Sequence, residues 1–205
     1  MADRPRRTKP SFAERREERA AIDDPAVVLE AAARFLESRS RSVAEVRRRL
    51  GRAGYRSELV DGAIARLTEL GMLDDEAFGR AWVESRDRAR PRGEIALRRE
   101  LSLKGVERTI VNDVLEARRS GTGTDGDGDG VGVDHVAAGR LLERHARSLG
   151  RVADLRQRRQ RAYGLLARNG FDPETCREAA SAFMAAALAA DVAGDDPEGE
   201  PDQDP

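Results

Sequence analysis

The sequence has little of what secreted and membrane proteins depend on. Its single cysteine, Cys176, excludes an internal disulfide and favours a reducing, cytoplasmic location. No apolar run approaches the roughly 20 residues that a membrane-spanning helix needs. The N-terminal segment lacks the apolar core of a secretory signal. We therefore expect a cytoplasmic protein without a membrane partner.

Aromatic residues are also scarce. One Trp, two Tyr and five Phe stand against 37% charged and 39% apolar residues in a chain of 205. Large side chains are too few to fill one deep core. The composition favours several small helical units, each of which buries a narrow apolar seam. No segment alternates apolar and polar residues as a strand would, so we predict an all-α fold.

Lysine is nearly absent, because Lys9 and Lys104 are the only ones among 37 basic residues. Arginine binds carboxylates and phosphates through a planar fork, whereas lysine offers a point charge. A GC-rich coding bias would also enrich arginine. The net charge of −1 hides a basic helical part and a tail, residues 191–205, with seven acidic and no basic groups. This distribution indicates a nucleic acid or a charged protein as partner.

Three segments are predicted to lack packed structure. Residues 1–24 mix both charges with little to bury, residues 120–133 have the Gly/Asp composition of a flexible linker, and residues 191–205 are acidic and rich in proline and glycine. The fold is therefore expected in the remaining stretches of the chain.

The residues that could take part in catalysis or bind a metal do not form a recognisable pattern. Residues 121–126 match G-x-G-x-x-G but follow a helix instead of a strand, and the calcium-loop match at 125–136 lacks the twelfth-position Glu. His135 and His145 lie ten residues apart and share no metal-binding spacing. Cys176 falls on an apolar position and is expected in the core. We therefore expect no catalytic residue, cofactor or metal, and no enzyme.

Three glycines reveal an internal repeat. Gly54, Gly105 and Gly170 each follow an apolar-periodic stretch and indicate the end of a helix. The first interval is 51 residues and the second is 65, and the excess of 14 equals the length of the segment 120–133. Apolar residues recur four positions before each glycine and one, five and nine after it: Leu50, Leu101 and Leu166; Tyr55, Val106 and Phe171; Val60, Val111 and Cys176; Ile64, Leu115 and Ala180. The chain is thus one unit written three times.

Each unit is predicted to hold three helices. The units span residues 25–73, 74–119 and 134–190, and capping signals mark helix starts at Asp24-Pro25, at Asp172-Pro173 and at the box Ser42 to Glu45. The expected helices cover residues 26–38, 43–53, 58–71, 75–89, 94–104, 107–118, 135–148, 152–169 and 174–189. Because one such bundle is near the lower limit for folding alone, neighbouring units should pack into an elongated, curved array.

The candidate functional residues are basic clusters on the second helix of each unit, together with Arg86 near the end of the first helix of the second unit. Their recurrence predicts a basic stripe that meets phosphates or an acidic protein groove. A solvated helix face balanced by Glu45, Glu94 and Glu100 is the alternative interpretation. The candidate contacts to partner or DNA are Arg47, Arg48, Arg49, Arg86, Arg98, Arg99, Lys104, Arg158, Arg159 and Arg161.

Three motifs resemble the RecX family, the bacterial regulators of RecA recombinase. LGMLDDEAFGRAWVESR over residues 70–86 is similar to the family's G-x-L-[DN]-D-x-x-[FY]-A-x-x-[YW]-[VI]-x-x-[RK] pattern. ELSLKGV over 100–106 and RAYGLLARNGF over 161–171 are similar to two further family motifs. Gly79 stands where the family usually has Ala. The insertion at 120–133 lies outside the family pattern.

The resemblance implies three tandem three-helix repeats and a non-enzymatic role. RecX-like proteins bind the RecA–single-stranded DNA filament in its groove and limit its growth. They thereby lower recombination, ATP hydrolysis and the RecA-assisted repressor cleavage of the SOS response. The implied partner is the RecA filament, with direct contact to single-stranded DNA as an option, and we expect a monomer.

Two other functions stay open from the residues alone. Short three-helix units resemble helix-turn-helix modules, which would make the chain a sequence-specific DNA-binding protein. No helix combines base-reading residues with an evident dimer seam, and footprinting on duplex DNA would decide. A helical adaptor without a nucleic-acid role is the other alternative. It would not sediment with RecA filaments.

Overall fold

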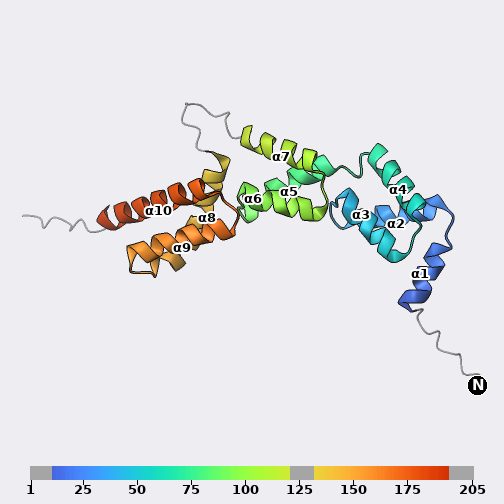
Figure 1. Cartoon of the computed structure of the whole chain (residues 1–205), viewed down its shortest axis with the longest axis horizontal. Coiled ribbons are helices and arrows are strands. Elements are labelled where there is room, and N and C mark those ends of the chain that lie inside the picture. Colours follow the sequence, from blue (N-terminus) through green and yellow to red (C-terminus); the bar gives the residue numbers. More distant parts are fainter. Residues whose placement is uncertain (1–10, 121–131, 194–205) are drawn as a thin grey trace, which may run out of the picture. The chain divides into compact units, whose positions relative to one another are not determined.

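The structure is a computed structural model that describes residues 11–120 and 132–193, and every regular element in these ranges is a helix (Figure 1). The all-α prediction is therefore confirmed. The helices are α1 (Phe12–Ala20), α2 (Pro25–Glu37), α3 (Val43–Ala53), α4 (Ser57–Glu69), α5 (Asp75–Ala89), α6 (Glu94–Lys104), α7 (Arg108–Ser120), α8 (Val133–Gly150), α9 (Leu155–Arg168) and α10 (Pro173–Ala193).

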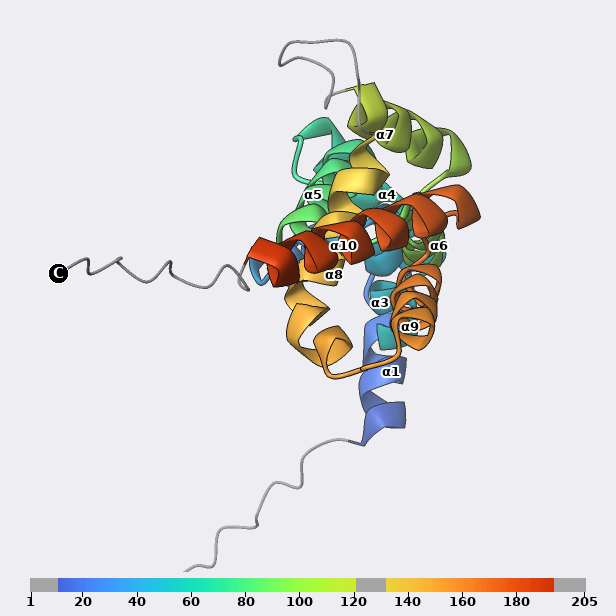
Figure 2. The ribbon, with the colours of Figure 1, turned by 90° about the vertical axis from the view of Figure 1, so that its left-hand side faces the viewer.

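The chain divides into two compact units, and the division runs through α5, α6 and α7. Among the described residues, the first unit contains residues 11–82 and 100–114, and the second contains residues 83–99, 115–120 and 132–193. In the second unit α8, α9 and α10 pack against one another (Figures 1 and 2). In the first unit α2 packs on α4, and α3 packs on both.

Helix starts follow the capping signals in the sequence. The Asp24 carboxylate accepts a hydrogen bond from the Ala26 amide at 2.9 Å. Ser42 and Glu45 form a reciprocal capping box at the start of α3, with 3.1 Å between the Glu45 amide and the Ser42 hydroxyl. Both devices satisfy amides that have no partner within the helix, so the chain enters α2 and α3 where the sequence predicts.

The repeat glycines end the second helix of each repeat in the same way. Gly54, Gly105 and Gly170 have φ values of 104°, 81° and 80°, a left-handed conformation that side chains with a Cβ rarely adopt. In all three places the amide after the glycine donates to the carbonyl five residues earlier, at 3.1 to 3.4 Å. The predicted helix stops are confirmed.

Repeat-equivalent apolar residues form the cores. In the first unit, Leu50, Val60 and Ile64 belong to one buried cluster that also contains Val28 of α2. In the second unit, the third-repeat equivalents Leu166, Phe171, Cys176 and Ala180 belong to one buried cluster with residues of α8. The core positions therefore match the repeat pattern in the sequence.

Second helices of consecutive repeats meet end to end. In the first unit the Ser42 hydroxyl at the start of α3 donates to the Lys104 carbonyl at the end of α6, at 2.6 Å. In the second unit the amides of Gly93 and Ile95 at the start of α6 donate to the carbonyls of Asn169 and Gly170 at the end of α9, at 3.1 and 3.2 Å. Each contact satisfies orphan groups of two helices at once.

One segment differs from the sequence-based expectation. Residues 1–24 were expected to lack packed structure, yet Phe12–Ala20 forms α1 with a capping box between Ser11 and Glu14. The capping box gives this short, highly charged helix a defined start. The Gly/Asp linker, including the two motif matches, and the acidic tail fall almost entirely outside the described residues.

Candidate functional site

The three predicted arginines of α3 lie exposed on the first unit. Arg47 forms an ion pair with Asp61 of α4 at 2.9 Å, and its side chain is 56% exposed. The Arg48 guanidinium donates to the Lys104 carbonyl at 3.4 Å, and that of Arg49 lies 5.7 Å from the centre of the Phe35 ring. Exposed contacts of this kind are weak and leave the cations accessible to a partner.

Lys104 is placed differently from the other predicted contacts. Its ammonium forms an ion pair with Glu45 at 2.9 Å, lies 4.8 Å from the Trp82 ring centre and is 23% exposed. Burial raises the pKa of the Glu45 carboxyl, but hydrogen bonds from Lys104 and Ser42 outweigh it, so the pKa is below its usual value. Lys104 therefore holds α6 against α3 and α5 within this unit.

Predicted residues of α5 and α6 in the second unit are less uniform. Arg98 forms an i,i+4 ion pair with Glu94 at 2.9 Å and is half-buried, as is Arg86 on α5. Arg99 is exposed. The balanced-face interpretation therefore fits Arg98, whereas Arg99 is presented to solvent.

Helix α9 carries five arginines and no acidic residue. Arg158 donates to the carbonyls of Val152 and Gly150 at 2.9 and 3.3 Å and so caps the end of α8. Arg159 donates to the Ser181 hydroxyl at 3.0 Å, and Arg161 is exposed. None of the α9 arginines forms an ion pair with a carboxylate in the described part of the chain. The helix is therefore a surface of uncompensated positive charge.

One face of α9 forms a shallow polar groove that the sequence analysis did not single out. The spacing i, i+3, i+4, i+7, i+11 would have found most of it, because polar or small residues at this spacing share one helical face. A Cβ placed on Gly164 would lie 3.2 Å from Nη1 of Arg168, so the Arg168 side chain packs over this glycine. The lining residues are Gln157, Gln160, Arg161, Tyr163, Gly164 and Arg168.

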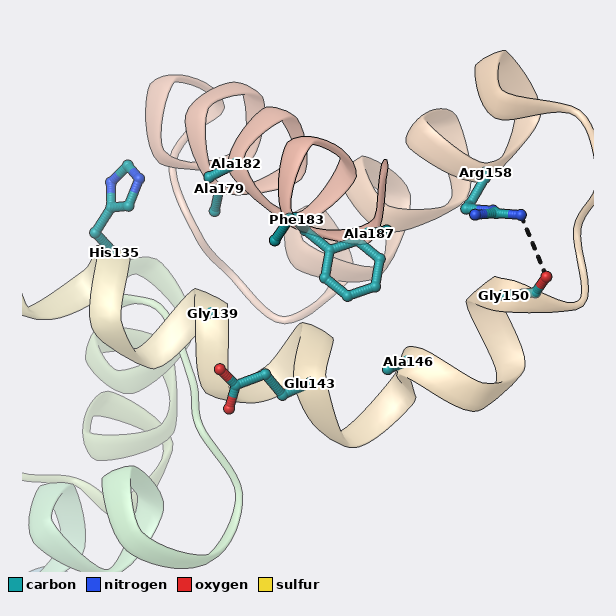
Figure 3. A pocket seen from close by; sticks show the side chains of 11 residues that line it. His135, Gly139, Glu143, Ala146, Gly150, Arg158, Ala179, Ala182, Phe183 and Ala187 are labelled. Carbon is teal, nitrogen blue, oxygen red and sulfur yellow. Dashed lines mark hydrogen bonds between the residues drawn. The ribbon is translucent and has the colours of Figure 1, made fainter. Parts of the chain in front are cut away.

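A second hollow, of about 460 Å³, lies between α8 and α10 (Figure 3). Alanine and glycine line most of it, Phe183 points into it, and Arg158 with its bond to Gly150 closes one end. The side chains of His135 and Glu143 lie on its rim and do not point toward each other (Figure 3). Apart from these three polar side chains its lining is apolar, and it offers no paired acid and base.

The described part of the chain holds no second reactive site at its cysteine or among its possible metal ligands. Cys176 is buried, its thiol lies 3.6 Å from the Phe171 carbonyl, and burial with the nearby Asp172 charge raises the thiol pKa. Within residues 11–120 and 132–193, no three His, Cys, Asp or Glu side chains gather as metal ligands. In the same ranges no helix is long and apolar enough to span a membrane.

Comparison with known proteins identifies the first two repeats. The family model described as RecX, first three-helix domain, matches residues 29–67, and the model of the RecX second three-helix domain matches residues 74–115. Regulatory protein RecX of Chlorobium phaeobacteroides (strain BS1) is 28% identical over 159 residues, which cover 77% of this chain and 94% of the relative. Regulatory protein RecX of Mycobacterium avium (strain 104) is 29% identical over 153 residues, covering 75% and 82%.

A solved structure supports the fold. The crystal structure of RecX from Lactobacillus salivarius superposes with a TM-score of 0.65 at 18% identity and covers 78% of this chain and 97% of that one. This likeness concerns the fold, and the two family models and the full-length relatives carry the assignment. Together these matches support the assignment of the chain to the RecX family of regulatory proteins.

Proposed function

We propose that this chain regulates RecA in the cytoplasm by binding, as a monomer, to the RecA–single-stranded DNA filament. In this proposal it lies in the filament groove, limits filament growth and lowers strand exchange, ATP hydrolysis and RecA-assisted repressor cleavage. Similarity to the RecX family supports RecA as the partner. The observation that carries the binding mode is the uncompensated charge of α9.

Helix α9 is suited to a polyanionic partner. Its arginines have no carboxylate partner in the described residues, so a partner's phosphate or carboxylate would not have to displace an existing ion pair. Arg161 and Arg168 lie one above the other along the groove face and are exposed. Two guanidinium groups on one face match a row of anions along a filament.

Contacts from the other repeats would add to those of α9. Arg47 and Arg49 on α3 and Arg99 on α6 are exposed in the same way. A single exposed arginine contributes little, but linked sites on one chain raise each other's effective concentration. The proposed mechanism is occupancy of the filament by three weakly binding repeats, without a covalent step.

The test is co-sedimentation with RecA filaments assembled on single-stranded DNA. The variant R161Q/R168Q removes two α9 charges and keeps most of each side chain. The matched control R140Q/R147Q removes two exposed arginines of α8. We expect R161Q/R168Q to bind filaments about tenfold or more weakly, because two charge-assisted contacts are lost, whereas the control binds like the wild type.

Two results would contradict the proposal. Wild-type chain that stays in the supernatant would exclude the filament as partner and would favour the adaptor alternative. Equal binding by R161Q/R168Q and wild type would remove α9 from the interface. Circular dichroism on each variant checks that the helical content is unchanged.

A further inference from the structure

Helix α1 lies outside both segments that the RecX family models match, yet it is docked on the first repeat. A Cβ placed on Gly54 would lie 2.6 Å from the backbone carbonyl oxygen of Arg16, so only glycine lets α1 approach this closely. The Arg19 guanidinium donates to the Ala53 carbonyl at 3.3 Å and lies 5.9 Å from the Tyr55 ring centre. The end of α3 thus fixes the position of α1.

The charges of α1 are sorted between its two faces. Phe12, Arg16 and Arg19 follow the spacing i, i+4, i+7 and share the face that meets α3. The acidic residues Glu14, Glu17 and Glu18 fall on the opposite side of the same helix. A helix with three arginines and three glutamates therefore presents a basic face toward α3.

Between α1 and α3 lies an open groove of about 530 Å³. Four arginines contribute to its walls, no carboxylate does, and Gly51 leaves its floor free of a side chain. Arg16, Arg49 and Arg52 are exposed. The complete lining is Phe12, Arg16, Arg19, Arg49, Gly51, Arg52 and Ala53.

Two features define the ligand that fits this groove. Converging guanidinium groups without a carboxylate bind anions, and their planar forks suit phosphate oxygens. Phe12 is 65% exposed at the edge of the groove, so its aromatic ring is available for stacking. Cationic grooves beside exposed aromatic rings are the arrangement that binds single-stranded nucleic acid, whose bases stack while its phosphates meet the cations.

We propose that the groove between α1 and α3 is a binding site for single-stranded nucleic acid, in which Phe12 stacks on a base and Arg16, Arg49 and Arg52 contact successive phosphates. This site lies in the first unit and is separate from α9. It does not require RecA, so it stands or falls independently of the proposed function.

The test uses the full chain without RecA. A fluorescein-labelled oligothymidylate of about 15 nucleotides is titrated, and fluorescence anisotropy gives the affinity over a series of salt concentrations. The variants are F12A and R16Q/R52Q. The control R66Q/R108Q removes two exposed arginines elsewhere in the same unit.

We expect each variant to change a different quantity. R16Q/R52Q should reduce the slope of log affinity against log salt by about 1.4, because each lost phosphate contact on a single strand contributes about 0.7. F12A should weaken binding roughly fivefold or more with an unchanged slope, since stacking carries no net charge. The control should keep the wild-type slope and affinity.

Several results would overturn the proposal. Wild-type behaviour of both F12A and R16Q/R52Q would show that the groove does not contact the strand. Two results together would identify the groove as a site for an acidic protein. F12A would bind the oligonucleotide as tightly as the wild type, and polyglutamate would displace the oligonucleotide from the wild type but not from R16Q/R52Q. The Gln side chain keeps the Cγ atom that packs on Gly54, so α1 stays docked in the double variant.

Discussion

A buried ion-paired arginine joins three helices of the second unit and gives the sharpest stability prediction. Arg118 of α7 donates from Nε and Nη2 to the two carboxylate oxygens of Asp87 in α5, at 2.9 and 2.8 Å. Its Nη1 donates to Asp134 of α8 at 2.6 Å. The second Asp134 oxygen accepts the Glu94 amide at the start of α6, at 2.9 Å.

The local environment makes this guanidinium hard to replace. Its side chain is 5% exposed, against 24% for Asp87 and 18% for Asp134. Burial lowers the pKa of Arg118, but the hydrogen bonds to both carboxylates raise it further, so the net pKa lies above its ordinary value. The charged form is therefore strongly favoured in the folded chain.

The substitution R118A would leave two partly buried carboxylates without a cation. Removing one partner of a buried ion pair costs about 3 to 5 kcal/mol, and the residual exposure of both aspartates places this case near the lower end, at about 3 kcal/mol. The neighbouring Arg119 is 51% exposed, so R119A should cost less than about 1 kcal/mol. Urea unfolding followed by circular dichroism measures both.

A variant in which Asp87, Arg118 and Asp134 are all replaced by uncharged residues provides a second test. Because the penalty comes from unpaired charge, D87N/R118M/D134N should recover more than half of the loss in R118A. If R118A lowers the free energy of unfolding no more than R119A does, the cluster does not hold these helices together. A triple variant as unstable as R118A would contradict the electrostatic origin of the loss.

Three further predictions concern single positions in the helices. In thermal or urea unfolding, G54A should lower the free energy of unfolding by about 1 to 2 kcal/mol, because the backbone of Gly54 is left-handed, with φ 104°. G51A should raise the free energy of unfolding by about 0.5 to 1 kcal/mol, because Gly51 lies inside α3 with open space around it. The Thr175 hydroxyl and nearby amides lower the pKa of Asp172, so D172A should lower the free energy of unfolding by about 1 kcal/mol at neutral pH. In a pH series of unfolding curves, this difference from the wild type should shrink as the pH falls through 3.8 and below. Burial and neighbouring carboxylates raise the pKa of Asp75, so the contribution of Asp75 to stability falls as the pH rises through this raised pKa. In the same assay at pH 7, D75N should therefore be as stable as the wild type or more stable, whereas D75A should be less stable than D75N.

Much of the fold could be predicted because its signals are local. A left-handed glycine, a capping serine and an aspartate before a proline each act within one helical turn, so Gly105, Ser42 and Asp24 mark helix ends without knowledge of the tertiary structure. The repeat added the core, since equivalent positions such as Leu101 and Leu166 share one environment.

The partner of each basic side chain could not be predicted from the sequence in the same way. Lys104, Arg118 and Arg158 look like other members of basic clusters in the sequence, yet each is committed to partners many residues away or to the end of another helix. Such pairings depend on tertiary packing. The acid-free composition of α9 was visible in the sequence, and the structure leaves Arg161 of this helix exposed, as it does Arg49 of α3 and Arg99 of α6.

The role of α1 was missed for a related reason. Its composition is that of an unpacked charged segment, and the sorting of its charges becomes meaningful only when Arg16 is seen against Gly54. A capping box at Ser11 and Glu14 was the available signal.

The most direct test of the account is RecA's DNA-dependent ATP hydrolysis, measured with increasing amounts of this chain. If the chain acts by occupying the filament and limiting its growth, hydrolysis falls at amounts well below one chain per RecA, and R161Q/R168Q requires far more protein for the same effect. Hydrolysis that stays unchanged with an equimolar amount of the wild-type chain would contradict it.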